Sequence, residues 1–166
     1  MVITTHYIRL ANLTDVPSLM RLQRASYPSW LNEDVSVFDT IIAKGRSVVA
    51  VENQPPYRVV GYMLVHCVTD PDTPPSLNGD IPTTDSKHIF VHDAVVEPSF
   101  RRMGIGSQMV DAVFARCEAI GTESVSIVSL PDAIEFWSRH EFAPCTNPVS
   151  ISSYGHGAVY MRLTKK

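Results

Sequence analysis

Residues 101–107 read Arg101-Arg102-Met103-Gly104-Ile105-Gly106-Ser107 and separate two segments of different pattern. Residues 88–96 form an apolar run typical of a buried strand, and residues 105–120 repeat apolar side chains with the period of an α-helix. Glycines let a backbone approach a ligand closely, and the start of a helix offers unpaired N–H groups and the positive end of a dipole. The arginines can add paired donors to a phosphoryl group. The pattern therefore predicts a strand, a phosphate-binding loop and a helix.

Two well-known phosphate loops do not fit this segment. A P-loop ends in Gly-Lys-Ser/Thr, but Gly106 is followed directly by Ser107. A dinucleotide-binding fingerprint needs glycine or alanine where this chain has Met109, and it belongs to a first βαβ unit rather than to a late segment. A glycine-rich turn that binds nothing stays open as the alternative to a third kind of loop.

That third loop is Arg/Gln-x-x-Gly-x-Gly/Ala, and Arg101, Gly104 and Gly106 match it position for position. In this respect the chain resembles the Gcn5-related N-acetyltransferases (GNAT), which hold the pyrophosphate of acetyl-CoA with this loop. Residues 123–129 then alternate as a strand, and residues 132–142 resemble the second motif of the family, Ala-x-x-Phe-Tyr-x-x-x-Gly-Phe. The matching residues are Ala133, Phe136 and Phe142, whereas Trp137 replaces the tyrosine and Glu141 the glycine.

The resemblance implies an α/β fold with a mixed, mostly antiparallel sheet, flanked by helices and splayed between the fourth and fifth strands. It implies acetyl-CoA as co-substrate and no metal. It also implies that backbone groups after the central strand orient the acetyl carbonyl. The residues expected to bind acetyl-CoA are Ala94, Val95, Val96, Arg101, Arg102, Met103, Gly104, Ile105, Gly106, Ser107, Phe136 and Trp137.

Within the superfamily, residues 88–101 resemble the branch that contains serotonin (arylalkylamine) N-acetyltransferase. That branch has two histidines two residues apart on this strand. His92 falls on the second histidine and Phe90 on the first, and Trp137 falls on the tyrosine that acts as general acid for the departing thiolate.

His92 is the expected catalytic residue. Strand alternation predicts that His88, Phe90, His92, Ala94 and Val96 share one face. An imidazole with a pKa of about 6.5 can accept a proton from an ammonium substrate near neutral pH, directly or through a water. The alternative is a histidine hydrogen-bonded within the core. His88, at the start of the strand, is expected to have a solvated structural role, and the two histidines lack an evident third metal ligand.

Aromatic residues between the first two predicted helices are candidates for acceptor binding. Tyr27, Pro28 and Trp30 could stack on an arylalkylamine ring or hold an ammonium by cation–π attraction. Phe90 on the strand and Tyr154 in a glycine-flanked turn are expected to complete the acceptor site. The alternative for the first group is hydrophobic packing around the end of a helix.

The composition agrees with a compact, soluble enzyme. The chain has 166 residues, 45% of them hydrophobic, and is expected to form a single N-acetyltransferase domain over residues 1–166. A net charge of −3 predicts neither nucleic-acid nor membrane binding. Three scattered cysteines favour reduced thiols in the cytoplasm, and no apolar run approaches the roughly 20 residues of a membrane span. The protein is expected to be a monomer or a homodimer.

Several other elements follow from local signals. Strands are predicted at residues 7–11, 47–51 and 59–68, and a helix is predicted after Asn12. Asn32 is expected to cap a second helix that has Glu33 in its first turn, and residues 70–86 form a long loop with four prolines.

The sequence thus predicts an enzyme that moves acetyl from acetyl-CoA to the primary amine of a small molecule, an arylalkylamine or a polyamine. Two alternatives remain open: acetylation of protein N-termini or lysines, and a non-catalytic module that binds acetyl-CoA. Because direct attack needs no covalent enzyme intermediate, the absence of a Cys–His–Asp order in the sequence fits such a transfer.

Overall fold

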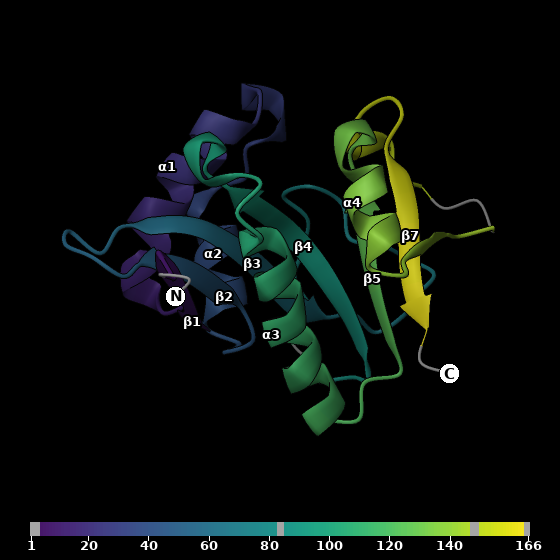
Figure 1. Ribbon diagram of the computed structural model, residues 1–166. Coiled ribbons are helices and arrows are strands. Elements are labelled where there is room, and N and C mark those ends of the chain that lie inside the picture. Colours follow the sequence, from purple (N-terminus) through teal and green to yellow (C-terminus); the bar gives the residue numbers. More distant parts are fainter. Residues whose placement is uncertain (1–3, 83–84, 147–149, 165–166) are drawn as a thin grey trace.

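A seven-stranded mixed sheet forms the centre of the protein (Figure 1). The computed structural model describes residues 4–82, 85–146 and 150–164. The strand order is β1-β2-β3-β4-β5-β7-β6, and the β4–β5 pair is parallel whereas the other pairs are antiparallel. The strands are β1 His6–Leu10, β2 Val48–Glu52, β3 Val59–Cys67, β4 His88–Val96, β5 Ser124–Ser129, β6 Ala143–Pro144 and β7 Val159–Thr164.

Helices cover both faces of the sheet. The α-helices are α1 Val16–Ser26, α2 Val35–Ile42, α3 Ile105–Ala119 and α4 Ile134–Arg139. Short 3-10 turns are η1 Leu13–Asp15, η2 Ser29–Leu31, η3 Pro98–Phe100, η4 Pro131–Ala133 and η5 Ser152–Tyr154. Helices α1 and α2 bury Leu19 and Phe38 against one face, and α3 and α4 bury Met109, Val113 and Trp137 against the other (Figure 1). The expected α/β fold with helices on both sides of a mixed sheet is confirmed.

The sheet opens between β4 and β5. Their parallel pairing covers His88 to Val91 on β4 and Ser124 to Ile127 on β5. Beyond that register β4 continues to Val96 along β3, while β5 continues to Ser129 along β7. The two strands therefore separate in the direction of the loop at residues 101–107 (Figure 1).

A β-bulge changes the side-chain alternation of β4 at the point of separation. Leu64 of β3 is opposite Asp93, but the next residue, Val65, is opposite Val91, so His92 is the extra residue. Val91 and Ala94 consequently pack on the α3 side, whereas His92 and Asp93 turn toward the α1 side. The prediction that His92 and Ala94 share one face was wrong, because strict alternation does not continue through a bulge.

The start of the second helix also differs from the prediction. Helix α2 begins at Val35 with Asp34 at its N-cap, so Glu33 precedes the helix instead of lying in its first turn. Gln23 of α1 holds Glu33 in place: the Glu33 N–H donates to Gln23 Oε1 at 2.8 Å, and Gln23 Nε2 donates to the Glu33 carbonyl at 3.1 Å. This tertiary contact keeps Glu33 buried and outside the helix.

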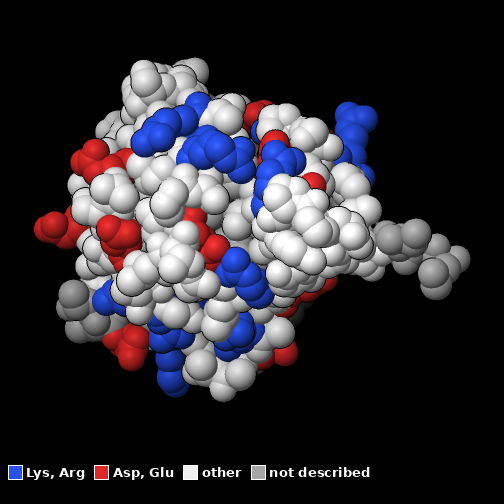
Figure 2. All heavy atoms as spheres, turned by 90° about the vertical axis from the view of Figure 1, so that its left-hand side faces the viewer, with Lys and Arg blue, Asp and Glu red and all other residues white. Residues whose placement is uncertain are grey.

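Charged side chains of both signs are mixed on the face drawn in Figure 2, which shows no extended area of one sign. No helix among the described residues has the length and apolar character needed to cross a bilayer.

Candidate active site

A cavity of about 480 Å³ lies where β4 and β5 separate. Its walls come from the end of α1, the bulged half of β4, the end of β5, helix α4 and turn η5. The volume is in the usual range for a small-molecule site. Wall residues that bear on the chemistry include Tyr27, Pro28, Glu33, His92, Asp93, Ala94, Val95, Val96, Arg101, Asp132, Phe136, Trp137 and Tyr154.

The glycine-rich loop borders this cavity and leads into α3. Gly104 is the N-cap of α3 in the left-handed conformation (φ 78°), and Arg102 also has a positive φ of 64°. No side chain caps this end of the helix, and the first bond of the helical ladder runs from Gln108 N–H to the Gly104 carbonyl. The first-turn N–H groups therefore have no partner within the helix and can receive an anion.

Gly106 is constrained by a neighbouring side chain, whereas Gly104 is constrained by its positive φ. A Cβ at Gly106 would lie 3.1 and 3.2 Å from two ring carbons of Phe136, closer than side chains normally approach. A small residue is therefore favoured here because α3 and α4 come close together, not because the backbone has a positive φ. The two helices thus meet at the mouth of the cavity.

The other predicted loop residues lie in different surroundings. Arg101 lines the cavity, and its Nε donates to the Val96 carbonyl at 3.2 Å. Arg102 and Met103 are exposed, whereas the Ile105 side chain is buried in the core and only its backbone can face a phosphate. Ser107 is bonded through its hydroxyl to His140 Nε2 at 3.0 Å.

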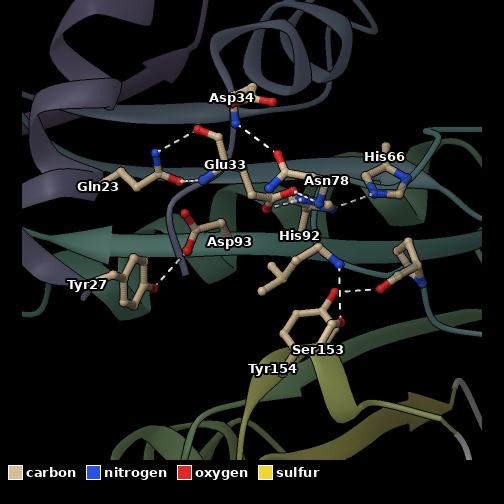
Figure 3. Close-up of polar contacts among 12 residues, drawn as sticks. Gln23, Tyr27, Glu33, Asp34, His66, Asn78, His92, Asp93, Ser153 and Tyr154 are labelled. Atoms are coloured by element: carbon tan, nitrogen blue, oxygen red, sulfur yellow. Dashed lines mark hydrogen bonds and ion pairs between the residues drawn. The ribbon is translucent and has the colours of Figure 1, made fainter. Parts of the chain in front are cut away.

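His92 lies in the middle of a buried row of polar groups (Figure 3). Its Nε2 is 2.7 Å from Glu33 Oε1, and its Nδ1 is 3.1 Å from His66 Nε2. The other ring nitrogen of His66 is 2.9 Å from the Cys67 carbonyl. Burial, and then the neighbouring His92, lower the pKa of His66 to about 4. The row runs from the cavity into the interior of the protein.

Asp93, the residue after His92 in the bulge, accepts hydrogen bonds from two tyrosine hydroxyls. Tyr27 Oη donates to Oδ1 at 2.7 Å and Tyr62 Oη donates to Oδ2 at 2.5 Å. Burial raises the pKa of the Asp93 carboxyl, and the two hydroxyls oppose that shift. Burial and the proximity of Asp93 raise the pKa of both tyrosines well above 10, so they donate and do not ionise near neutral pH. Glu33 and Asp93 give the cavity two carboxylates.

The fold and the sequence agree on one family. The model described as the acetyltransferase (GNAT) family matches residues 16–142. The chain belongs to this family. It is therefore an N-acetyltransferase with acetyl-CoA as co-substrate. Comparison with curated protein sequences gives no match.

Several solved structures have the same fold. Ard1 from Thermoplasma volcanium is 19% identical with a TM-score of 0.73, over 97% of this chain and 98% of that one. Naa50 from Arabidopsis thaliana, in complex with the bisubstrate analogue CoA-Ac-MVNAL, is 15% identical with a TM-score of 0.72, over 98% and 100%. PaiA N-acetyltransferase from Thermoplasma acidophilum, in complex with coenzyme A, is 10% identical with a TM-score of 0.72, over 98% and 100%. At these identities the similarity concerns the fold alone.

The predicted acceptor residues of this acetyltransferase are only partly brought together. Tyr27, Pro28 and Tyr154 line the cavity. Phe90 does not: it is fully buried and packs against the rings of His66 and His92 at centroid distances of 5.6 and 6.0 Å. Trp30 is 59% exposed and lies against Gly155, outside the cavity wall. We therefore correct these two assignments: Phe90 supports the histidines, and Trp30 covers a turn.

Trp137 lines the cavity but is itself 3% exposed. Its ring packs edge-on against Phe136 and Phe142 at centroid distances of 5.0 and 5.2 Å. This arrangement fits a residue that shapes the wall formed by α4.

The loop predicted at residues 70–86 passes beside the acceptor end of the cavity; its residues 83 and 84 lie outside the described part of the chain. Asn78 donates its N–H to Glu33 Oε2 at 2.9 Å and accepts the Asp34 N–H on its side chain at 3.0 Å. One residue earlier, Leu77 lines the cavity, and Tyr154 Oη donates to the Pro75 carbonyl at 2.6 Å. The loop thus fixes Glu33 and Tyr154 from outside (Figure 3).

Local sequence patterns did not indicate Glu33, His66 or Asp93 as site residues. Asp93 carried a weak signal, a carboxylate inside an apolar strand. The described residues contain no group of three or more His, Cys, Asp or Glu side chains placed to hold a metal ion.

Proposed function

We propose that this acetyltransferase acts on the primary amine of a small molecule, an arylalkylamine or a polyamine, and that His92 takes part in accepting the proton of the amine. The observation that carries the proposal is the contact of His92 Nε2 with Glu33 Oε1 at 2.7 Å in the wall of the cavity. The resemblance of residues 88–101 to the arylalkylamine branch supports the same reading.

The loop residues fit acetyl-CoA. The free N–H groups at the start of α3 and the Arg101 guanidinium suit a pyrophosphate, and the close approach of the Phe136 ring to Gly106 favours a small residue there. Because β4 has left β5 after Val91, the backbone of Ala94, Val95 and Val96 faces the cavity and can orient an acetyl carbonyl. Trp137 and Phe136 then form the wall along the pantetheine arm.

The acceptor end of the cavity favours a cationic, partly aromatic amine. Glu33 and Asp93 supply carboxylates, and Tyr27 and Tyr154 supply aromatic rings. Carboxylates attract the ammonium form, and tyrosine rings can stack on an aryl group or contact a cation.

The proposed reaction is a direct transfer. The ammonium loses a proton to the His92–Glu33 pair, and the free amine attacks the acetyl carbonyl. The N–C bond forms, the C–S bond breaks and CoA leaves as a thiolate; the nitrogen gives up its second proton as it becomes an amide, and that proton goes to the thiolate or to solvent. A thiol with a pKa of about 8.5 is a tolerable leaving group without full protonation, so Trp137 is not needed as an acid. Neither Tyr154 nor Cys145 serves better: burial raises the pKa of both, and Cys145 does not line the cavity.

Acetylation of protein N-termini is the second candidate. It is favoured by the similarity of the fold to Naa50, which was solved with a bisubstrate analogue containing the peptide MVNAL. The third candidate is a module that binds acetyl-CoA without turnover.

Release of free CoA thiol separates the three candidates. The protein is incubated with acetyl-CoA and, one at a time, arylalkylamines, polyamines and peptides with free N-termini. Small amines are expected to give the fastest release. Release with peptides alone would support N-terminal acetylation, and saturable CoA binding without any release would support the module.

A further inference from the structure

We propose that His66 is a positioning residue: it fixes His92 in the tautomer that carries its proton on Nδ1, so that the other ring nitrogen, Nε2, shares a proton with Glu33 at the cavity. The inference rests on the proposed function, in which the His92–Glu33 pair accepts the amine proton. It adds a third residue to that pair, from β3, a strand that does not line the cavity.

The argument starts at the buried end of the row. The Cys67 carbonyl can only accept a hydrogen bond, so the facing His66 Nδ1, 2.9 Å away, carries a hydrogen and donates it. His66 is fully buried, and its pKa of about 4 keeps it neutral near pH 7. A neutral imidazole has one N–H only, so His66 Nε2 is an acceptor.

The tautomer of His92 follows from that of His66. His66 Nε2 faces His92 Nδ1 at 3.1 Å, and because the first atom is an acceptor the second must donate. Nδ1 of His92 therefore keeps its hydrogen, and Nε2 is the nitrogen that gains and loses a proton. In many enzyme sites, a hydrogen bond from a neighbouring residue to one ring nitrogen decides which nitrogen of the catalytic histidine carries the proton.

The hydrogen bond between His92 Nε2 and Glu33 Oε1 requires a second proton, located between these two atoms. At 2.7 Å either an imidazolium donates to a carboxylate or a carboxylic acid donates to a neutral imidazole, and both forms hold the same number of protons. If that proton leaves, two lone pairs face each other at the cavity wall. This deprotonated pair is the form that can receive an ammonium N–H.

Protons and charges balance in this step. The N–H bond of the ammonium breaks, a bond to His92 Nε2 or Glu33 Oε1 forms, and the electron pair stays on the amine nitrogen. The charge of the pair rises from −1 to 0 as the amine becomes neutral. The proton returns to solvent, or to the departing thiolate, before the next turnover.

Several neighbours define the charge around His92. Glu33 contacts it from the segment before α2 and His66 from β3, and the charge of the adjacent Asp93 on β4 also acts on it. Tyr154 of η5 lies near Glu33 and Asp93 as a neutral hydroxyl. Lys44 acts on His66 only through its field. The ring of Phe90 packs against both histidines. Among the described residues no cation contacts the pair, so its proton balance depends on Glu33, His66 and Asp93.

Nuclear magnetic resonance of protein labelled with ¹⁵N-histidine tests the tautomers without acetyl-CoA or amine. Long-range ¹H–¹⁵N correlations are expected to show His66 neutral with its hydrogen on Nδ1. For His92 we expect the hydrogen on Nδ1 whenever the ring is neutral. A neutral His92 with its hydrogen on Nε2 would overturn the proposal, whatever activity the enzyme has.

Two substitutions of His66 test whether the tautomer of His92 affects turnover. In His66→Phe the ring volume remains but the acceptor for His92 Nδ1–H is lost. We expect His92 to shift toward the Nε2–H tautomer and kcat to fall about ten- to a hundredfold, part of what a general base contributes. The KM for acetyl-CoA should stay the same. In His66→Gln the amide oxygen can accept the Nδ1–H, so the tautomer and most of kcat should return.

His88→Gln is the matched control, because His88 bonds Ser124 Oγ at 2.9 Å and is not part of the row. It should leave the His92 spectrum and kcat as in the parent. If folded His66→Phe keeps the parent spectrum and pH–rate profile, His66 has no positioning role. If the parent releases no thiol with any acceptor while its tautomers are as expected, the proposed function fails and the tautomer assignment stands.

Discussion

Nε2 of His92 lies 2.7 Å from Oε1 of Glu33, although the two residues are 59 positions apart in the chain. Their contact joins the bulge of β4 to the segment before α2, in the wall of the cavity. Both side chains are almost fully buried, at 1% and 5% exposure, so water screens the interaction little.

Glu33→Gln tests this contact. The amide keeps the size of the side chain but removes its negative charge, and it leaves no carboxylate to share the proton. We expect turnover to fall by about 10²–10⁴-fold, the range of general-base effects, with acetyl-CoA affinity unchanged. Steady-state kinetics and calorimetry give the two values. Glu123→Gln, which changes an exposed carboxylate paired with Lys87, is the control. Parent-like turnover of Glu33→Gln would exclude Glu33 from the reaction.

His92→Ala should lower turnover at neutral pH by about 10²–10⁴-fold, because the nitrogen that accepts the proton is lost. The deficit should narrow as the pH rises, since more of the amine is then free without help from the enzyme. A pH–rate profile of the variant measures both effects. A profile with the same shape and height as that of the parent would remove His92 from the mechanism.

Gly106→Val should abolish acetyl-CoA binding while the fold survives. The new Cβ would meet the Phe136 ring at 3.1 Å, pushing α4 or the start of α3 out of position at the mouth of the cavity. Calorimetry with acetyl-CoA measures the loss, and circular dichroism checks the fold. Ala115→Val, on the exposed side of the same helix, controls for the β-branched residue. Undiminished affinity in folded Gly106→Val would contradict the assignment of this loop.

His66 should make the stability of the protein depend on pH. Its pKa falls from 6.5 to about 4 on folding, so below pH 6.5 the unfolded chain binds a proton that the folded chain does not. The free energy of unfolding should therefore decrease as the pH falls from 6.5 toward 4. This histidine should contribute roughly 2–3 kcal/mol to that decrease, and the contribution should be missing in His66→Gln. Urea unfolding of both proteins at several pH values measures the difference, and parallel pH dependences would contradict the burial of a neutral His66.

Trp137→Phe should retain a substantial fraction of turnover, and Trp137→Tyr should be equal to the parent or faster. The indole packs against Phe136 and Phe142, so the smaller ring costs packing, on the order of 1–3 kcal/mol of stability, rather than a proton donor. Thiol-release kinetics and thermal unfolding distinguish the two effects. Loss of turnover with intact acetyl-CoA affinity would mean that the indole N–H takes part in the reaction.

The order of strand, loop and helix around residues 101–107 was predictable because it depends on local signals. The glycines, the period of the apolar residues and the positions of the arginines can all be recognised within one short stretch of sequence. The same is true of α4, although Trp137 within it and Glu141 just after it depart from the family motif. The splay of β4 and β5 followed from the resemblance.

The polar row at the cavity was not predictable in this way. The bulge at His92 arises from the register with β3, and it turns Asp93 to the same side as His92, which alternation forbids. Glu33 reaches the site because Gln23 holds its backbone outside the helix, whereas the local sequence pattern predicted it in the first helical turn. His66 lies in a strand that is buried along its whole length, so nothing in its neighbourhood sets it apart. Each of these positions depends on contacts between distant segments.

One competition experiment tests the central claim most directly. The parent protein receives acetyl-CoA and an equimolar mixture of arylalkylamines, polyamines and peptides with free N-termini, and mass spectrometry identifies which molecules gain an acetyl group. We expect acetylated small amines from the parent and very little product from His92→Ala at neutral pH. Acetylated peptides without acetylated small amines, or equal yields from the parent and His92→Ala, would contradict the account.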